Sequence, residues 1–229
     1  MKFVASDFDN TLYFPDNEEQ NIKNSNTIVK FNLSGNIFCV ITGRNFTDVK
    51  KLLNEYSISY HYLICEDGAK IFDKDDFCLS TTYLDPKMVQ KVVDLLRNRP
   101  CNYYLDNGYQ ETENIYQCVK VVVKCSDEKE KEEIVSYVKN ELDVHIYASR
   151  YHVNIIDTSV NKKVALEKLL QMKNIEEADV YVIGDNDNDF EMIERFQGVV
   201  MRKHHPILDQ LQRKEYDTLE EYLEELMNN

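Results

Sequence analysis

Long apolar segments are missing from this sequence. No apolar run approaches the ~20 residues that a membrane-spanning helix requires. The N-terminus also lacks a basic segment followed by an apolar one, and Asp7 and Asp9 interrupt it early, so no secretory signal peptide is expected. These absences predict a cytoplasmic protein that has no membrane as a partner.

Positive charge is scarce relative to negative charge. The 229 residues carry 27 Lys and Arg against 41 Asp and Glu, a formal net charge of −14. Such a surface repels phosphodiester backbones, so a nucleic acid is not an expected partner. A small phosphorylated ligand is still possible, because a metal ion and a few donors can reverse the local field.

Other familiar signatures are also absent. None of the six cysteines forms a C-x-x-C pair, so reduced thiols are expected rather than a disulfide framework. No Walker-type glycine-rich loop occurs, so a nucleotide clamp is not indicated. No internal repeat and no low-complexity segment was found.

What is present is a series of short apolar runs that are typical of strands buried on both faces. They are FVAS (3–6), IFCVIT (37–42), YLIC (62–65) and VYVIG (180–184). Residues with helical spacing occur at 49–56, 166–172 and 219–226. Strands of this kind alternating with helices predict an α/β fold, with a Rossmann-like parallel sheet and right-handed crossovers.

The middle of the chain has a different pattern. A helix is expected at 86–98, strands at 102–106 and 117–125, and a second helix over 126–142. Two further strands, one of them at 151–156, are expected to pair through a turn. We therefore predict an inserted α+β domain at 81–157, and a core domain formed by residues 1–80 and 158–229.

Polar residues follow the predicted core strands or open a helix. Asp7 and Asp9 follow the first strand, Thr42-Gly43-Arg44 follows the second, Lys162-Lys163 opens a helix, and GDNDND (184–189) follows the strand at 180–184. Each feature alone is common in turns and on solvated helix faces. Their joint order argues for a site, because ligands of open α/β sheets bind beyond the carboxyl ends of the strands.

The residue types at this edge favour phosphoryl transfer. Asp7, Asp9 and Asp185 would crowd three carboxylates together, which is costly unless a cation neutralises them. Oxygen ligands suit Mg²⁺, which also bridges to a substrate phosphate. A lysine and a threonine hydroxyl supply a positive charge and a donor for phosphate oxygens.

Four segments together resemble the motifs of the haloacid dehalogenase (HAD) superfamily of phosphatases. They are DFDNTL, ITGR, VNKKVAL and GDNDND, and their order and spacing cover the whole chain. The insert resembles the α+β cap of the Cof-like, type IIB branch, and EDGAKIFD (66–73) is similar to the NGA segment that leads into that cap.

The resemblance implies a role for each matched residue in the reaction. Asp7 would be the nucleophile that becomes an aspartyl phosphate. Asp9 would be the general acid for the leaving group and then the base for the attacking water. Lys162 would neutralise charge on Asp7 and on the phosphoryl oxygens.

The resemblance also implies a set of binding residues. Mg²⁺ would be held by the carboxylates of Asp7 and Asp185 and by the backbone carbonyl of Asp9. Thr42 and the amide of Gly43 would bind phosphate oxygens. The remaining two matched positions, Asn188 and Asp189, would brace the metal and the lysine, or in the case of Asn188 contact the substrate.

Three positions depart from the family pattern. Asn10 stands where glycine is common in this branch, and little effect is expected. Asn186 stands where the family often has glycine, and asparagine is the best substitute if the position needs a positive φ. Lys163 stands where glycine usually follows the catalytic lysine, so either lysine is a candidate, and the motif register favours Lys162.

The predicted function is a Mg²⁺-dependent phosphomonoester hydrolase that acts on a small phosphorylated metabolite, with a sugar phosphate favoured. A phosphomutase uses the same aspartyl phosphate and stays open as an alternative. A phospho-receiver domain fits less well, because of the large insert, and so does a phosphate-binding protein without turnover, because no catalytic residue is missing. The oligomeric state is open.

The leaving group should be recognised by the insert, whose loops are free to vary. Its polar and aromatic candidates are Tyr103, Tyr104, Arg150, His152 and Asn154.

Overall fold

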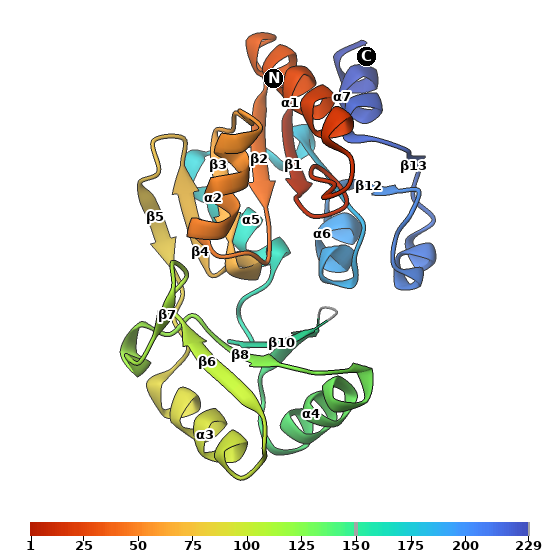
Figure 1. Cartoon of the computed structure of the whole chain (residues 1–229). Helices are drawn as coiled ribbons and strands as arrows, with labels where there is room; N and C mark the ends of the chain where they lie inside the picture. Colours follow the sequence, from red (N-terminus) through yellow and green to blue (C-terminus); the bar gives the residue numbers. More distant parts are fainter. Residues whose placement is uncertain (149–150, 229) are drawn as a thin grey trace.

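An eight-stranded sheet forms the centre of the first domain (Figure 1). We describe residues 1–148 and 151–228 from a computed structural model. The strand order is β13-β12-β11-β1-β2-β3-β4-β5, with parallel pairing from β13 to β3 and antiparallel pairing from β3 to β5. The strands are β1 (Phe3–Asp7), β2 (Ile37–Ile41), β3 (Tyr62–Cys65), β4 (Lys70–Asp73), β5 (Cys78–Thr81), β11 (Val180–Gly184), β12 (Gln197–Met201) and β13 (Glu215–Tyr216).

The four strands predicted from sequence are neighbours, in the order β11-β1-β2-β3, so their carboxyl ends share one edge. Helices cover both faces of this sheet, as expected for continuous apolar strands. Val4 of β1 packs in a cluster with α1 (Glu18–Leu33), α2 (Phe46–Glu55) and α7 (Leu219–Asn228). Its neighbours Phe3 and Ala5 pack on the other face with α5 (Lys162–Lys173) and α6 (Phe190–Arg195). The predicted α/β fold is confirmed.

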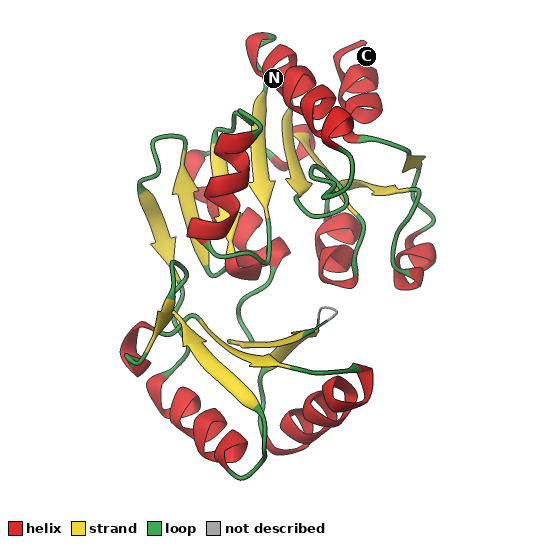
Figure 2. Ribbon diagram, in the orientation of Figure 1, coloured by secondary structure: helices red, strands yellow, loops and turns green. Residues whose placement is uncertain are grey.

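A second, antiparallel sheet is inserted between β5 and α5, and Figure 2 shows it below the first domain. Its order is β7-β6-β8-β10-β9. Its elements are α3 (Pro86–Arg97), β6 (Asn102–Asp106), β7 (Glu111–Thr112), β8 (Lys120–Lys124), α4 (Glu128–Glu141), β9 (His145–Ala148) and β10 (His152–Ile156). The predicted inserted α+β unit is confirmed, whereas its limits at 81 and 157 stay a prediction.

The inserted sheet has one apolar and one polar face. Val121, Val123, Val153 and Ile155 are buried against α3 and α4. Because side chains alternate along a strand, Lys120, Val122, His152 and Asn154 point to the opposite face, where they line a cavity shared with the first domain. In the part of the chain that the structure describes, no helix is long and apolar enough to cross a membrane. All six cysteines are free.

Candidate active site

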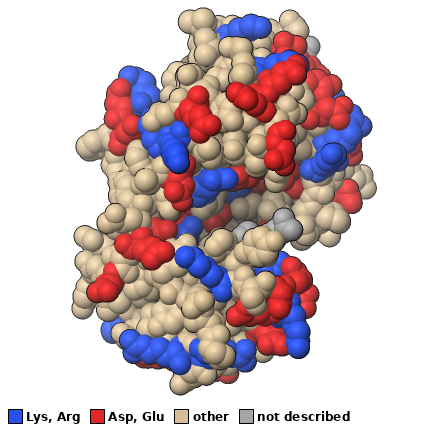
Figure 3. Space-filling model, viewed as in Figure 1, with Lys and Arg blue, Asp and Glu red and all other residues tan. Residues whose placement is uncertain are grey.

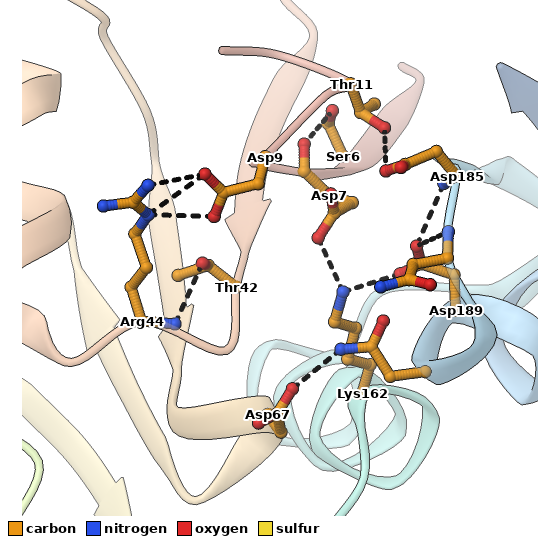
Figure 4. Close-up of polar contacts among 12 residues, drawn as sticks. Ser6, Asp7, Asp9, Thr11, Thr42, Arg44, Asp67, Lys162, Asp185 and Asp189 are labelled. Carbon is orange, nitrogen blue, oxygen red and sulfur yellow. Dashed lines mark hydrogen bonds and ion pairs between the residues drawn. The ribbon is translucent and has the colours of Figure 1, made fainter. Parts of the chain in front are cut away.

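The predicted site residues converge at the carboxyl edge of the core sheet (Figure 4). Asp7 is the last residue of β1, Thr42 follows β2, Asp185 follows β11, and Lys162 is the first residue of α5. The side chain of Asn161 caps α5 by accepting a hydrogen bond from the Val164 amide at 2.8 Å, which fixes where the helix begins.

Lys162, and not Lys163, reaches the carboxylates. Its Nζ lies 2.6 Å from Asp7 Oδ1 and 2.7 Å from Asp189 Oδ1, and only 2% of the residue is exposed. Lys163 is partly exposed and, among the described residues, forms no ion pair. The geometry therefore assigns the buried cation of the site to Lys162, and its catalytic role remains a prediction.

Asp189 is fully buried, and both of its oxygens are occupied. Oδ2 accepts hydrogen bonds from the backbone amides of Asp185 and Asn186, both at 3.0 Å, while Oδ1 faces Lys162. Gly184 makes room for this carboxylate, since a Cβ there would lie 2.4 Å from Asp189 Cγ. Asp189 thus ties α5 to the loop after β11.

Asp7, Asp185 and Asp189 form a carboxylate cluster that suits a cation. One oxygen from each lies within 4.8 Å of the others. Burial raises the pKa of Asp7, with a further increase from Asp189 and Asp185, although Lys162 opposes it. Burial and Asp189 also raise the pKa of Asp185 to about 6. Crowded carboxylates of this kind are relieved by a metal ion.

The hydrogen bonds around the cluster distinguish its members as ligands. Both oxygens of Asp189 accept hydrogen bonds, so neither is free to bind a metal ion. Asp185 accepts a hydrogen bond from a side chain on Oδ1, from the Thr11 hydroxyl at 3.0 Å. The turn after β1 is closed by bonds to the carbonyls of Phe8 and Tyr13, not to that of Asp9. Asp7 and Asp185 therefore keep carboxylate oxygens for an oxygen-ligated cation such as Mg²⁺, and the Asp9 carbonyl stays a predicted third ligand.

The turn after β2 presents a hydroxyl and an amide. Thr42 is buried, and its Oγ1 accepts a hydrogen bond from the Arg44 amide at 3.1 Å, so the hydroxyl hydrogen stays available to a ligand. A Cβ at Gly43 would lie 2.9 Å from Asp67 Oδ1, so a larger residue there would displace that carboxylate. Both groups suit the predicted binding of anionic oxygens.

Three asparagines of the motifs, Asn188, Asn186 and Asn10, each have a distinct place in the structure. The Asn188 amide donates to Asp67 Oδ1 at 2.8 Å, so it contacts a residue that the motifs did not single out. Asn186 has φ −120°, so this position does not need a positive φ, and the condition under which asparagine would be the best substitute is not met. Its side chain caps the turn at Asp187–Asp189. The positive φ occurs at Asn10, with φ 60°, where asparagine tolerates the left-handed region.

Asp9 is paired with Arg44, whose side chain was given no role from the sequence. The guanidinium donates from Nε to Asp9 Oδ2 at 2.8 Å and from NH2 to Oδ1 at 2.6 Å. The same guanidinium lies over the rings of Phe8 and Tyr13. Neither Asp9 oxygen is free of Arg44 in this arrangement.

A cavity of about 720 Å³ separates this edge from the inserted sheet, and Figure 3 shows the surface hollowed there. One row of paired residues crosses four strands along its far wall: Tyr104, Val122, Asn154 and Tyr147. Of the predicted leaving-group candidates, Tyr104, His152 and Asn154 line the cavity. Tyr103 instead packs on the helical face, because it is one residue out of phase, and Arg150 lies outside the described residues.

Comparisons with known proteins agree with this geometry. The family model for a haloacid dehalogenase-like hydrolase matches residues 4–116 and 100–221. A 5-amino-6-(5-phospho-D-ribitylamino)uracil phosphatase of Bacillus subtilis is 25% identical, with 85% of each chain covered.

Solved structures share the fold. A HAD/COF-like hydrolase from Plasmodium vivax superposes with a TM-score of 0.87 and 14% identity, covering 100% of this chain and 96% of the other. A HAD subclass IIB sugar phosphatase gives a TM-score of 0.78 and 12% identity, covering 99% of each chain. The chain belongs to the haloacid dehalogenase-like hydrolase family, and its fold is that of the Cof-like, type IIB branch.

Proposed function

We propose that this protein is a Mg²⁺-dependent phosphomonoesterase that acts on a small phosphorylated metabolite through an aspartyl phosphate. One observation carries the proposal. Asp7 stands at the end of the central strand, faces the cavity, and has its carboxylate fixed by the buried Lys162 at 2.6 Å. A nucleophile positioned in this way, beside a candidate metal site, is suited to in-line attack on phosphorus.

In the first half of the reaction, a carboxylate oxygen of Asp7 attacks phosphorus and the bond to the ester oxygen breaks. Asp9 gives its proton to that oxygen, so a neutral alcohol leaves. Thr42 and the Gly43 amide hold phosphoryl oxygens, and Lys162 offsets the negative charge that builds up. When bound by Asp7, Asp185 and the Asp9 carbonyl, Mg²⁺ supplies further charge neutralisation and alignment of the phosphate.

In the second half, a water molecule attacks phosphorus while Asp9, now ionised, accepts the proton from that water. The bond between Asp7 and phosphorus breaks, and inorganic phosphate is released. Asp9 has to leave Arg44 for these transfers, since Arg44 engages both of its oxygens. We infer that a substrate phosphate draws Arg44 away when it binds.

For Arg44, we expect the methionine variant to have a raised KM, because the guanidinium that leaves Asp9 would contact the substrate phosphate. A loss of about tenfold in kcat/KM is expected for a charged hydrogen bond. Steady-state kinetics measure it, with Arg99→Met as a control, because Arg99 stacks on Tyr137 away from the cavity. Equal kinetics for wild type and the Arg44 variant would contradict this role.

The lining of the cavity supports a neutral leaving group such as a sugar or another polyol. The described lysines and arginines of the lining each pair with a carboxylate: Arg44 with Asp9, Lys120 with Glu66, and Lys131 with Glu128. Asn154 and the two tyrosines of the row offer hydrogen bonds and flat apolar surfaces to a polyhydroxylated group. The Bacillus subtilis relative is named for a substrate that carries a phosphoribityl group, which is consistent with this.

The proposal is tested by a phosphate-release screen over sugar phosphates, nucleotides, cofactor phosphates and phosphorylated carboxylic acids. We expect turnover that requires Mg²⁺, is lost in EDTA and is poorly supported by Ca²⁺, whose longer bonds misplace the nucleophile. Mg²⁺ should also raise Tm, because it binds the folded carboxylate cluster. Full activity in chelator-treated protein would rule out the metal dependence, and a transferred phosphate recovered on a second sugar would indicate a mutase.

A further inference from the structure

Lys120 is a lysine of the inserted sheet that is buried against the core domain. It is 6% exposed, and its Nζ lies 2.5 Å from Glu66 Oε2, in the segment after β3. The same Nζ donates a hydrogen bond to the backbone carbonyl of Gly43 at 3.0 Å. A buried ammonium is costly unless it is paired, so these two contacts fix where the side chain lies.

The Gly43 carbonyl belongs to a peptide unit that is held at both ends. Its oxygen accepts from Lys120, and its N–H, which is that of Arg44, donates to Thr42 Oγ1 at 3.1 Å. The rest of the turn is held by the core. The Glu66 amide donates to the Arg44 carbonyl, and the Asp67 amide donates to the Thr42 carbonyl, each at 3.0 Å. Lys120 is thus a contact from the inserted sheet that supports this turn.

We propose that Lys120 is a positioning residue for the phosphate-binding turn Thr42–Gly43–Arg44. By fixing the Gly43–Arg44 peptide, Lys120 keeps the Arg44 amide on Thr42 Oγ1, so the Thr42 hydroxyl hydrogen points to the phosphate rather than to the backbone. Phosphate affinity then depends on how the inserted sheet is positioned against the core domain. This inference rests on the proposed phosphatase function and adds a residue to it.

Other contacts keep this side of the insert on the core when Lys120 is changed. The Phe46 amide donates to the Gly108 carbonyl at 2.9 Å, and the Tyr109 ring packs against Phe46 and Phe72. Loss of Lys120 therefore removes the support of the turn without detaching the insert.

The test uses inorganic phosphate as a competitive inhibitor and several substrates with different leaving groups. For Lys120→Met, we expect the inhibition constant of phosphate to rise about tenfold, the loss typical of a hydrogen bond from a charged donor. KM should rise by the same factor for p-nitrophenyl phosphate and for sugar phosphates, because the turn contacts only their common phosphoryl group. Lys87→Met is the control, since Lys87 is an exposed lysine of the same insert, in α3 and outside the cavity lining.

Two companion variants separate positioning from stability. Lys120→Met leaves Glu66 buried without its partner, so the double variant Lys120→Met, Glu66→Gln removes both charges at nearly constant volume. It should show the same loss of phosphate affinity. Glu66→Gln alone keeps the Lys120–Gly43 bond, and its phosphate inhibition constant should stay within about twofold of wild type, well below the loss of one hydrogen bond.

Three results would overturn the inference. One is an unchanged phosphate inhibition constant in the double variant. Another is a change in KM that depends on the leaving group, which would place Lys120 on that group instead. A third is a loss in Glu66→Gln as large as that in the double variant. If wild type releases phosphate from no ester, the proposed function itself fails, and that outcome is distinct from these three.

Discussion

Replacing Asp7 with asparagine is expected to abolish phosphate release while the fold stays intact. Asparagine is nearly isosteric, and its Oδ1 can still accept the hydrogen bond from Lys162, but an amide cannot form the acyl phosphate. The variant should also be at least as stable as wild type without metal. Burial and the two neighbouring carboxylates raise the pKa of Asp7, so the neutral side chain relieves a folded state that disfavours the charge.

The measurements are kcat by phosphate release and Tm with and without Mg²⁺. Asp16→Asn is a matched control, because Asp16 is an exposed acid in the segment after the same strand and should behave as wild type. Turnover of Asp7→Asn within about tenfold of wild type would falsify the nucleophile assignment, since such a change is smaller than the loss of one transition-state contact.

The core strands and most of the site could be predicted because their signals are local. Buried parallel strands are continuous apolar runs, so β1, β2, β3 and β11 are visible in the sequence. Their order in the sheet then brings Asp7, Thr42 and Asp185 to one edge. The motif residues could be predicted to meet at one edge because the carboxyl edge of a parallel sheet is set by the strand order, and not by the contacts of individual side chains.

Helix α1 was not predicted, because its buried face is partly polar. Asn21 and Asn24 are fully buried in that face, and their side chains bond to backbone groups of the turn after β1. Apolar residues at helical spacing are therefore few in this segment, and the sequence pattern does not indicate a helix. Strands β4, β5, β12 and β13 were also not predicted. β13 is only two residues long, and β5 is partly exposed throughout.

The functional contacts that sequence reasoning missed are those made between distant segments. Arg44 lies in a recognised motif, but its pairing with Asp9 depends on how the turns after β1 and β2 face each other. Lys120 lies in the otherwise apolar strand KVVVK. Because side chains alternate between the two faces of a strand, Lys120 lies on the face away from α3 and α4. That alternation shows only that Lys120 faces the core domain, whereas its partners Glu66 and Gly43 come from the tertiary structure.

The two adjacent lysines of α5 should differ sharply in their effect on catalysis. Lys162→Met is expected to lower kcat/KM by at least ~10²–10³-fold, as for the loss of one preorganised charge donor in a transition state. Lys163→Met should stay within about fivefold of wild type, because an exposed charge contributes less than ~1 kcal/mol. The difference arises because neighbours on a helix point about 100° apart, so only Lys162 reaches Asp7 and Asp189.

Stability has to be measured beside activity in this pair. Lys162→Met leaves Asp7 and Asp189 buried without their cation, and breaking a buried ion pair costs about 3–5 kcal/mol. Circular dichroism should therefore define a temperature at which the variant is folded, and kinetics should be measured there, with saturating Mg²⁺ to offset part of the lost charge. Lys162→Arg keeps the charge but not its position, so it should recover stability more than turnover. If Lys163→Met lost activity while Lys162→Met stayed active, the catalytic lysine would be Lys163.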